Sequence, residues 1–153
     1  MKKTLILTLL FAFVGLSAQE INWLSLEQAE VEMKKSPEKS LFIDFYTDWC
    51  GWCKKMDMST FIEPEVVNYI NQKYIAVKFD AESKEEVNFR GKSYKYVKPQ
   101  GSYKGVNSFA YFSLRGNLSY PAYAVIKNDG KLDRLLLGFM PKEQLIQKLE
   151  MEN

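Results

Sequence analysis

The sequence predicts an α/β domain in which a central mixed sheet is flanked by helices. Apolar runs of strand length alternate with amphipathic stretches of helix length, which predicts a parallel core. The turn Asn128-Asp129-Gly130 adds an antiparallel hairpin at the edge of that sheet. A length of 153 residues, of which 46% are apolar, suits a single domain with its own hydrophobic core.

Each element follows from a local signal. Ser25 and Gln28 have capping-box spacing, Ser36-Pro37 ends that helix near Lys35, and Glu63-Pro64 opens another helix with proline in its first turn. The expected elements are a short entering strand at Ile21-Asn22-Trp23, a helix from Ser25 to Lys35, a strand from Ser40 to Tyr46 buried on both faces, a helix from Cys50 to Thr60, the helix opened by Glu63-Pro64, strands at Tyr74 to Asp80, Ala122 to Lys127 and Lys131 to Gly138, and a helix from Pro141 to Met151.

The composition excludes several classes of function. The chain has no histidine, which removes Ser-His-Asp and Cys-His triads and every metal site that contains histidine. Lys and Arg number 21 and Asp and Glu number 19, and this mild excess does not indicate nucleic-acid binding.

The N-terminus, residues 1–18, has the anatomy of a secretory signal peptide. Lys2 and Lys3 precede an apolar run, and Ser17-Ala18 supplies small residues before the expected cleavage. A membrane anchor or a buried helix is the alternative, but the run is shorter than the roughly 20 apolar residues of a membrane span. We therefore expect residues 19–153 to be exported to the periplasm or secreted, without stable membrane insertion. Without residues 1–18, the chain carries 19 basic and 19 acidic side chains.

The motif Cys50-Gly51-Trp52-Cys53 directly follows the predicted buried strand and its turn. Half of a zinc site is one interpretation, but zinc needs four ligands, and a partner would have to supply those that the chain lacks. A purely structural disulfide is another, although so short a loop constrains little of the unfolded chain. The spacing favours a redox-active dithiol.

The expected helix gives the two cysteines different roles. If Cys50 lies in the first turn, unsatisfied N–H groups and the helix dipole lower the pKa of its thiol. Cys50 is then the attacking nucleophile. Cys53, one turn on and deeper, resolves the mixed disulfide.

The segment LFIDFYTDWCGWCKKM resembles the active site of thioredoxins, in which an apolar strand carrying an aspartate runs into Trp-Cys-Gly-Pro-Cys-Lys. The run CKKMDMSTFIEPEVVNYIN is similar to the exported bacterial branch of that family. The resemblance extends from Ser40 to the C-terminal helix, interrupted by a long insertion. It implies a thioredoxin fold and thiol-disulfide oxidoreductase activity that requires no metal and no organic cofactor.

The resemblance also implies site residues. Asp44 matches the family's buried acid, which relays the proton of Cys53, although a solvated aspartate at a strand end is the alternative. Lys78 matches the lysine that faces this acid, unless strand alternation points it outward. Tyr120-Pro121 matches the cis-proline loop, which packs against the disulfide and pairs with the substrate backbone.

Two tryptophans lie beside the cysteines. Trp49 either packs against the fold or shields the sulfur of Cys50. Trp52 takes the place of the family's common proline, and the histidine of strongly oxidising relatives is absent. We therefore expect a reductant or isomerase-like carrier rather than a primary oxidase, with Trp52 as a contact platform for a partner.

Residues 82–119 form the long insertion before the cis-proline strand, with one short helix expected within Val106 to Leu114. Two interpretations stay open: a packing layer with a solvated basic face, or a partner-recognition surface. Such basic and aromatic residues also bind single-stranded nucleic acid, but export and mild charge make that a remote option.

The sequence leaves two hypotheses of function. The first is an exported thiol-disulfide oxidoreductase that acts on protein thiols and disulfides and is served by an upstream redox partner. The second is a thioredoxin-like binding or chaperone module whose cysteines form a stable disulfide. Their reduction potentials separate the two.

Overall fold

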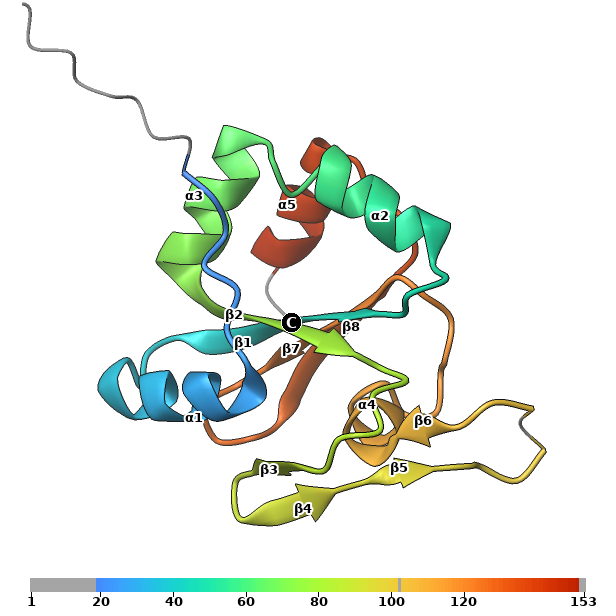
Figure 1. The fold of residues 1–153 in the computed structure, drawn as a ribbon. Coiled ribbons are helices and arrows are strands. Elements are labelled where there is room, and N and C mark those ends of the chain that lie inside the picture. Colours follow the sequence, from blue (N-terminus) through green and yellow to red (C-terminus); the bar gives the residue numbers. More distant parts are fainter. Residues whose placement is uncertain (1–18, 102, 152–153) are drawn as a thin grey trace, which may run out of the picture.

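The computed structural model describes residues 19–101 and 103–151, so the predicted signal peptide, residues 1–18, lies outside the described part. A four-stranded sheet forms its centre (Figure 1). The strands are β1 (Ser40–Tyr46), β2 (Tyr74–Asp80), β7 (Ala122–Ile126) and β8 (Leu132–Leu137), in the order β2-β1-β7-β8. The β1–β2 pair is parallel and the other two pairs are antiparallel, which confirms the mixed sheet.

The prediction that the central strands run parallel is wrong for β7, which runs antiparallel to β1. The reason lies in the connection from β2. The Asn107 N–H donates to the carbonyl of Ala81 at 2.8 Å, so the insertion returns to the end where β2 stops. The helix that follows, α4 (Ser108–Ser113), has six residues. It spans only about 9 Å, and β7 begins with Ala122 opposite Phe45, at the same end of the sheet, so the strand runs back antiparallel to β1.

Helices cover both faces of the sheet. Figure 1 shows α1 (Leu26–Lys35) and α4 on one face, and α2 (Gly51–Met58), α3 (Pro64–Lys73) and α5 (Lys142–Glu150) on the other. Strand alternation sends Leu41, Ile43 and Phe45 into the first core and Phe42 into the second. Asp44 therefore projects toward α2, α3 and α5.

Among the described residues, no helix combines the length and apolar character that a membrane crossing needs.

Several local predictions are confirmed. Ser25 and Gln28 form both hydrogen bonds of the capping box, Pro64 is the first residue of α3, and Gly130 adopts a φ of +88° in the β7–β8 turn. The entering strand at residues 21–23 is wrong, because only Leu24 forms a bridge there, to Val77.

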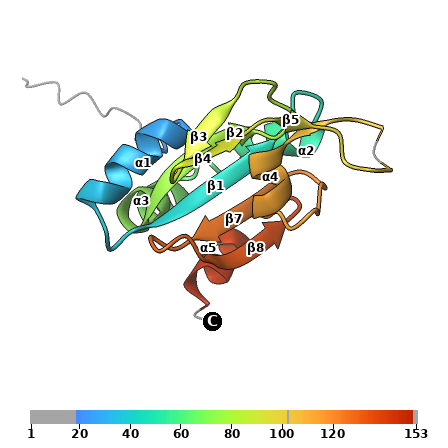
Figure 2. The same ribbon diagram turned by 90° about the horizontal axis from the view of Figure 1, so that it is seen from below.

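The insertion contains more structure than the expected helix. Two small hairpins precede α4, formed by β3 (Val87–Phe89) with β4 (Lys92–Tyr94), and by β5 (Tyr96–Val97) with β6 (Val106–Asn107). These strands have two or three residues each. Such segments are too short for alternation to reveal. Figure 2 shows the β3–β4 hairpin beside α1.

Phe109 of α4 joins the insertion to the core. Its ring centroid lies 5.9 Å from that of Phe45 in β1, 5.0 Å from Phe79 in β2, 5.6 Å from Phe89 and 5.2 Å from Tyr94. This half of the insertion is therefore a packing layer.

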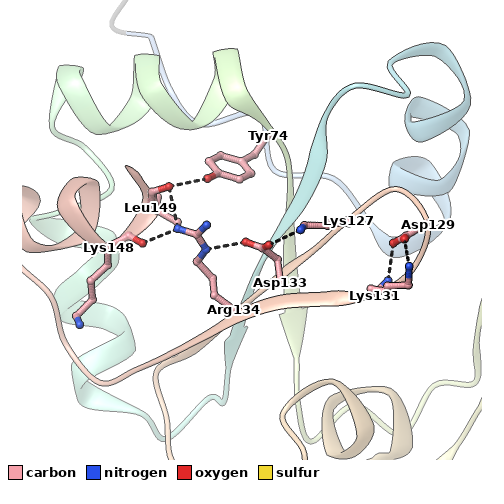
Figure 3. A network of polar contacts seen from close by, with 8 residues as sticks. All are labelled: Tyr74, Lys127, Asp129, Lys131, Asp133, Arg134, Lys148 and Leu149. Carbon is pink, nitrogen blue, oxygen red and sulfur yellow. Dashed lines mark hydrogen bonds and ion pairs between the residues drawn. The ribbon is translucent and has the colours of Figure 1, made fainter. Parts of the chain in front are cut away.

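A polar network holds the last turn of α5 against the sheet (Figure 3). One terminal guanidinium nitrogen of Arg134 donates to the carbonyls of Lys148 and Leu149 at 2.8 and 3.0 Å. Its Nε donates to Asp133 at 2.8 Å, and the Tyr74 hydroxyl donates to Leu149 at 3.2 Å. A cation therefore satisfies carbonyls that end the helix.

Candidate active site

The two cysteines lie where β1 passes into α2. Cys50 is the N-cap residue of α2, and Cys53 lies in its first turn. They form a disulfide with 5.3 Å between their Cα atoms, and the Cys53 N–H donates to Cys50 Sγ at 3.1 Å. The sulfur of Cys50 therefore faces the amide groups and the positive dipole of the helix, as its expected role requires.

The expected difference in depth between the cysteines is not seen. In the disulfide-bonded protein both residues are 4% exposed. The first-turn position of Cys50 is also refined, since its backbone is extended and the helix begins at Gly51.

Asp44 is buried as expected, with 2% of its surface exposed. It pairs in register with Lys78 of β2 and with Tyr123 of β7. Burial raises the pKa of Asp44 to about 7, although the nearby Lys78 ammonium acts to lower it. This carboxyl group therefore changes protonation near neutral pH, where a proton relay is effective.

Lys78 faces the acid, as the resemblance implies. Its Nζ lies 3.7 Å from Asp44 Oδ2 and donates to Asp57 Oδ1. The ammonium also lies 5.5 Å from the ring centroids of Trp23 and Tyr46. One cation is thus shared between two carboxyl groups and held between aromatic rings.

The sequence pattern does not single out Asp57 as part of this cluster. It lies four residues after Cys53 in α2, so both residues share one face of the helix. That spacing is the signal that points to it, but its contact with Lys78 depends on how α2 lies over the sheet. Because Asp57 carries like charge, it raises the pKa of Asp44.

A cleft of about 360 Å³ opens beside Lys78 and Asp57. Trp23, Phe61 and Ile62 are among the other residues that line it. Solvent therefore reaches the charged end of the cluster, while Asp44 lies deeper.

The Tyr120–Pro121 peptide bond is cis, which confirms the expected conformation of this loop. Pro121 is buried at the start of β7, and its carbonyl accepts from the Gly138 N–H at 2.8 Å. Its expected contacts with the disulfide and with substrate stay predictions.

The two tryptophans are exposed. Trp49 is 56% exposed, with its ring centroid 6.1 Å from that of Tyr120 and 4.5 Å from Lys104 Nζ. Trp52 is 60% exposed, and its ring packs on Phe139 at 5.5 Å. Trp49 thus packs on Tyr120 of the cis-proline loop, and both rings present apolar surface next to the cysteines in the chain.

Within residues 19–101 and 103–151, no three His, Cys, Asp or Glu side chains lie close enough together to bind a metal ion.

Comparison with models of known protein families shows the family to which the chain belongs. The model of the family Thioredox_DsbH, described as a protein of unknown function (DUF255), matches residues 13–104, more than half of the chain. The chain belongs to this family. The predicted thioredoxin-like resemblance and the α/β thioredoxin fold are confirmed.

Individual proteins that are similar to the chain include thiol:disulfide interchange proteins and a solved oxidoreductase. The chain is 25% identical over 122 residues to a thiol:disulfide interchange protein DsbD of Neisseria meningitidis, covering 79% of this chain but only 17% of that relative. The solved C-terminal domain of N. meningitidis DsbD in its reduced form is similar with a TM-score of 0.57 and 26% identity, over 84% of this chain and 94% of that domain. A solved DsbH oxidoreductase has a TM-score of 0.57 and 18% identity, over 98% of this chain and 92% of the other. This last similarity concerns the fold.

Proposed function

We propose that the protein is an exported thiol-disulfide oxidoreductase that reduces or exchanges protein disulfides through Cys50 and Cys53. One observation carries the proposal: the disulfide lies at the N-terminus of α2, and Asp44 is buried in the sheet face that α2 covers. The family and the relatives named for thiol:disulfide interchange support this chemistry.

The first step uses Cys50 as the nucleophile. In the reduced protein, its thiolate attacks one sulfur of a client disulfide, and a bond forms between Cys50 and the client. The second client sulfur leaves as a thiolate and takes a proton from solvent. The helix N-terminus favours the thiolate form of Cys50.

The second step uses Cys53 and the buried acid. The Asp44 carboxylate takes the proton of the Cys53 thiol, and the new thiolate attacks Cys50 Sγ. The bond between Cys50 and the client breaks, and the client sulfur leaves as a thiolate that solvent protonates. Two electrons have then moved to the client, and an upstream dithiol partner must reduce the Cys50–Cys53 bond again.

Lys78 and Asp57 connect this acid with solvent. We assign to Lys78 the role of stabilising the Asp44 carboxylate after the proton leaves, because its ammonium lies within ion-pair distance. The cleft beside Lys78 and Asp57 then offers an exit to water.

The client binds beside the disulfide in this proposal. Trp49 and Trp52 provide exposed apolar surface, and the loop of Tyr120 and Pro121 pairs with the client backbone.

The proposal of export rests on the signal-peptide pattern of residues 1–18. After expression of the full chain in a Gram-negative host, we expect a periplasmic product that starts near Gln19; an uncleaved cytoplasmic chain would contradict export.

Trapping tests the catalytic proposal. A Cys53→Ala variant should accumulate mixed disulfides with client proteins through Cys50, because the resolving thiol is gone. Cys50→Ala is the matched control and should form none. The adducts should disappear on reduction with dithiothreitol. If Cys53→Ala forms no adducts, or no more than the control, the catalytic proposal fails.

The reduction potential separates an exchange enzyme from a binding module with a stable disulfide. We expect a value of about −270 to −120 mV, the range of catalytic dithiols of this fold. A value below roughly −300 mV would identify a structural bond. Within the catalytic range, a reduction potential of about −270 mV would support a protein that reduces its clients rather than oxidises them.

A further inference from the structure

Tyr123 of β7 has a role that the two-cysteine mechanism does not use. It is the largest of the fully buried side chains, with 0% of its surface exposed. Its ring stacks on Phe42 at 5.7 Å with 10° between the planes, and Phe61 meets it edge-on at 6.0 Å. The position of the phenol ring is therefore set by the apolar core.

The hydroxyl of Tyr123 is buried and has no hydrogen-bond partner among the described residues. Buried polar groups are nearly always hydrogen-bonded, to protein or to an internal water. Phenylalanine would fill the same space without a polar atom, and the chain uses phenylalanine at positions 42 and 61 beside it. The hydroxyl therefore calls for a partner of its own.

The same holds for one oxygen of Asp44. Lys78 lies near Oδ2, whereas Oδ1 is buried and accepts no hydrogen bond from any residue that the structure describes. Asp44 and Tyr123 are directly opposite residues in the β1–β7 pair, so their side chains project from the same face of the sheet. Burial raises the pKa of the Tyr123 hydroxyl, and the negative charge of the neighbouring Asp44 raises it further.

The surroundings leave few other groups to act on this pair. Lys78 faces Asp44 from β2, Asp57 faces it from α2, and Tyr46 precedes the turn on β1 itself. The side chains that α3 and α5 bury in this core are apolar: Val66, Val67, Ile70, Leu145 and Leu149.

We propose that Tyr123 is a positioning residue whose hydroxyl donates, through one shared internal water, to the free Oδ1 of Asp44. An internal water is the usual partner of buried polar groups that find no partner in the protein. Donation to the carboxylate stabilises its charged form, so Tyr123 lowers the proton affinity of Asp44. The relay role of Asp44 rests on the proposed function, but the hydrogen bond itself does not.

A Tyr123→Phe variant tests the proposal in the oxidised protein, where the cysteines do not titrate. The ¹³C-carboxyl resonance of Asp44, assigned with Asp44→Asn, should titrate about one pH unit higher in the variant, the shift expected from loss of a charge-assisted hydrogen bond. Tyr74→Phe is the matched control, because its hydroxyl bonds to Leu149 and should leave Asp44 unchanged. An unchanged or lower midpoint in folded Tyr123→Phe overturns the proposal.

A second measurement covers the case in which Tyr123→Phe does not fold. A high-resolution crystal structure of the oxidised wild type should show one water within hydrogen-bond distance of both Asp44 Oδ1 and the Tyr123 hydroxyl. Absence of that water from a fully ordered site overturns the proposal. Failure of the exchange activity alone, with the shift present, would contradict the proposed function and leave the Tyr123 hydrogen bond supported.

Discussion

An Asp44→Asn substitution keeps the size of the side chain and removes its charge. It therefore isolates the electrostatic cost of placing this carboxyl group in the core. Burial raises the pKa of Asp44 from 3.8 to about 7 in the folded protein. At about 1.4 kcal/mol for each pH unit, this shift corresponds to about 4 kcal/mol.

The sign follows from proton binding. Below about pH 4, Asp44 is protonated in the folded and in the unfolded chain, and the shift has no effect on stability. Between about pH 4 and pH 7 the unfolded chain loses this proton while the folded protein keeps it, so the free energy of unfolding falls with rising pH. Above about pH 7 both forms are ionised and the whole cost is present.

The assay is urea denaturation of the oxidised protein, followed by circular dichroism from pH 4 to pH 8.5. The stability of Asp44→Asn relative to wild type should increase across this range by up to about 4 kcal/mol. Asp48→Asn, at an exposed position just after β1, is the control and should change stability by less than about 0.5 kcal/mol at every pH. A difference between Asp44→Asn and wild type that does not vary with pH would refute the reasoning.

Three further predictions concern neighbouring features. Lys78→Gln should raise the pKa of Asp44 further, because the ammonium acts to lower it; a carboxyl titration by NMR that shows no rise would contradict this. Phe109→Ala should lower the free energy of unfolding by about 3 to 5 kcal/mol, against less than about 1 kcal/mol for the exposed Phe112→Ala. Arg134→Met should cost about 2 kcal/mol in the same denaturation assay, since the half-buried Asp133 and two helix carbonyls lose this partner; a cost below about 0.5 kcal/mol would refute that account.

The elements that the sequence predicts well are those with strong local signals. The strand Ser40–Tyr46 is a continuous apolar run, and the capping box at Ser25 defines a helix start by side-chain chemistry alone. The cis bond before Pro121 follows from a proline at the head of a central strand together with the family resemblance. These signals are local, so tertiary structure does not have to be known.

What the sequence does not predict depends on contacts between distant segments. The direction of β7 depends on where the insertion returns to the sheet, beside Ala81 at the end of β2, and no periodicity encodes that contact. Asp57 joins the site only because α2 lies over Lys78. Tyr123 reads as one more apolar strand residue until its register opposite Asp44 is known.

The packing of Phe109 has a consequence for local stability. Its contacts with Phe45 and Phe79 make the β3–β4 hairpin and α4 part of the same core as the central sheet. Because the buried rings of Phe89 and Phe109 anchor these segments to the sheet core, the amide hydrogens near them should exchange more slowly with solvent than those of the largely exposed residues 95–101. The β3–β4 hairpin and α4 are therefore held in place by the same core that stabilises the central sheet.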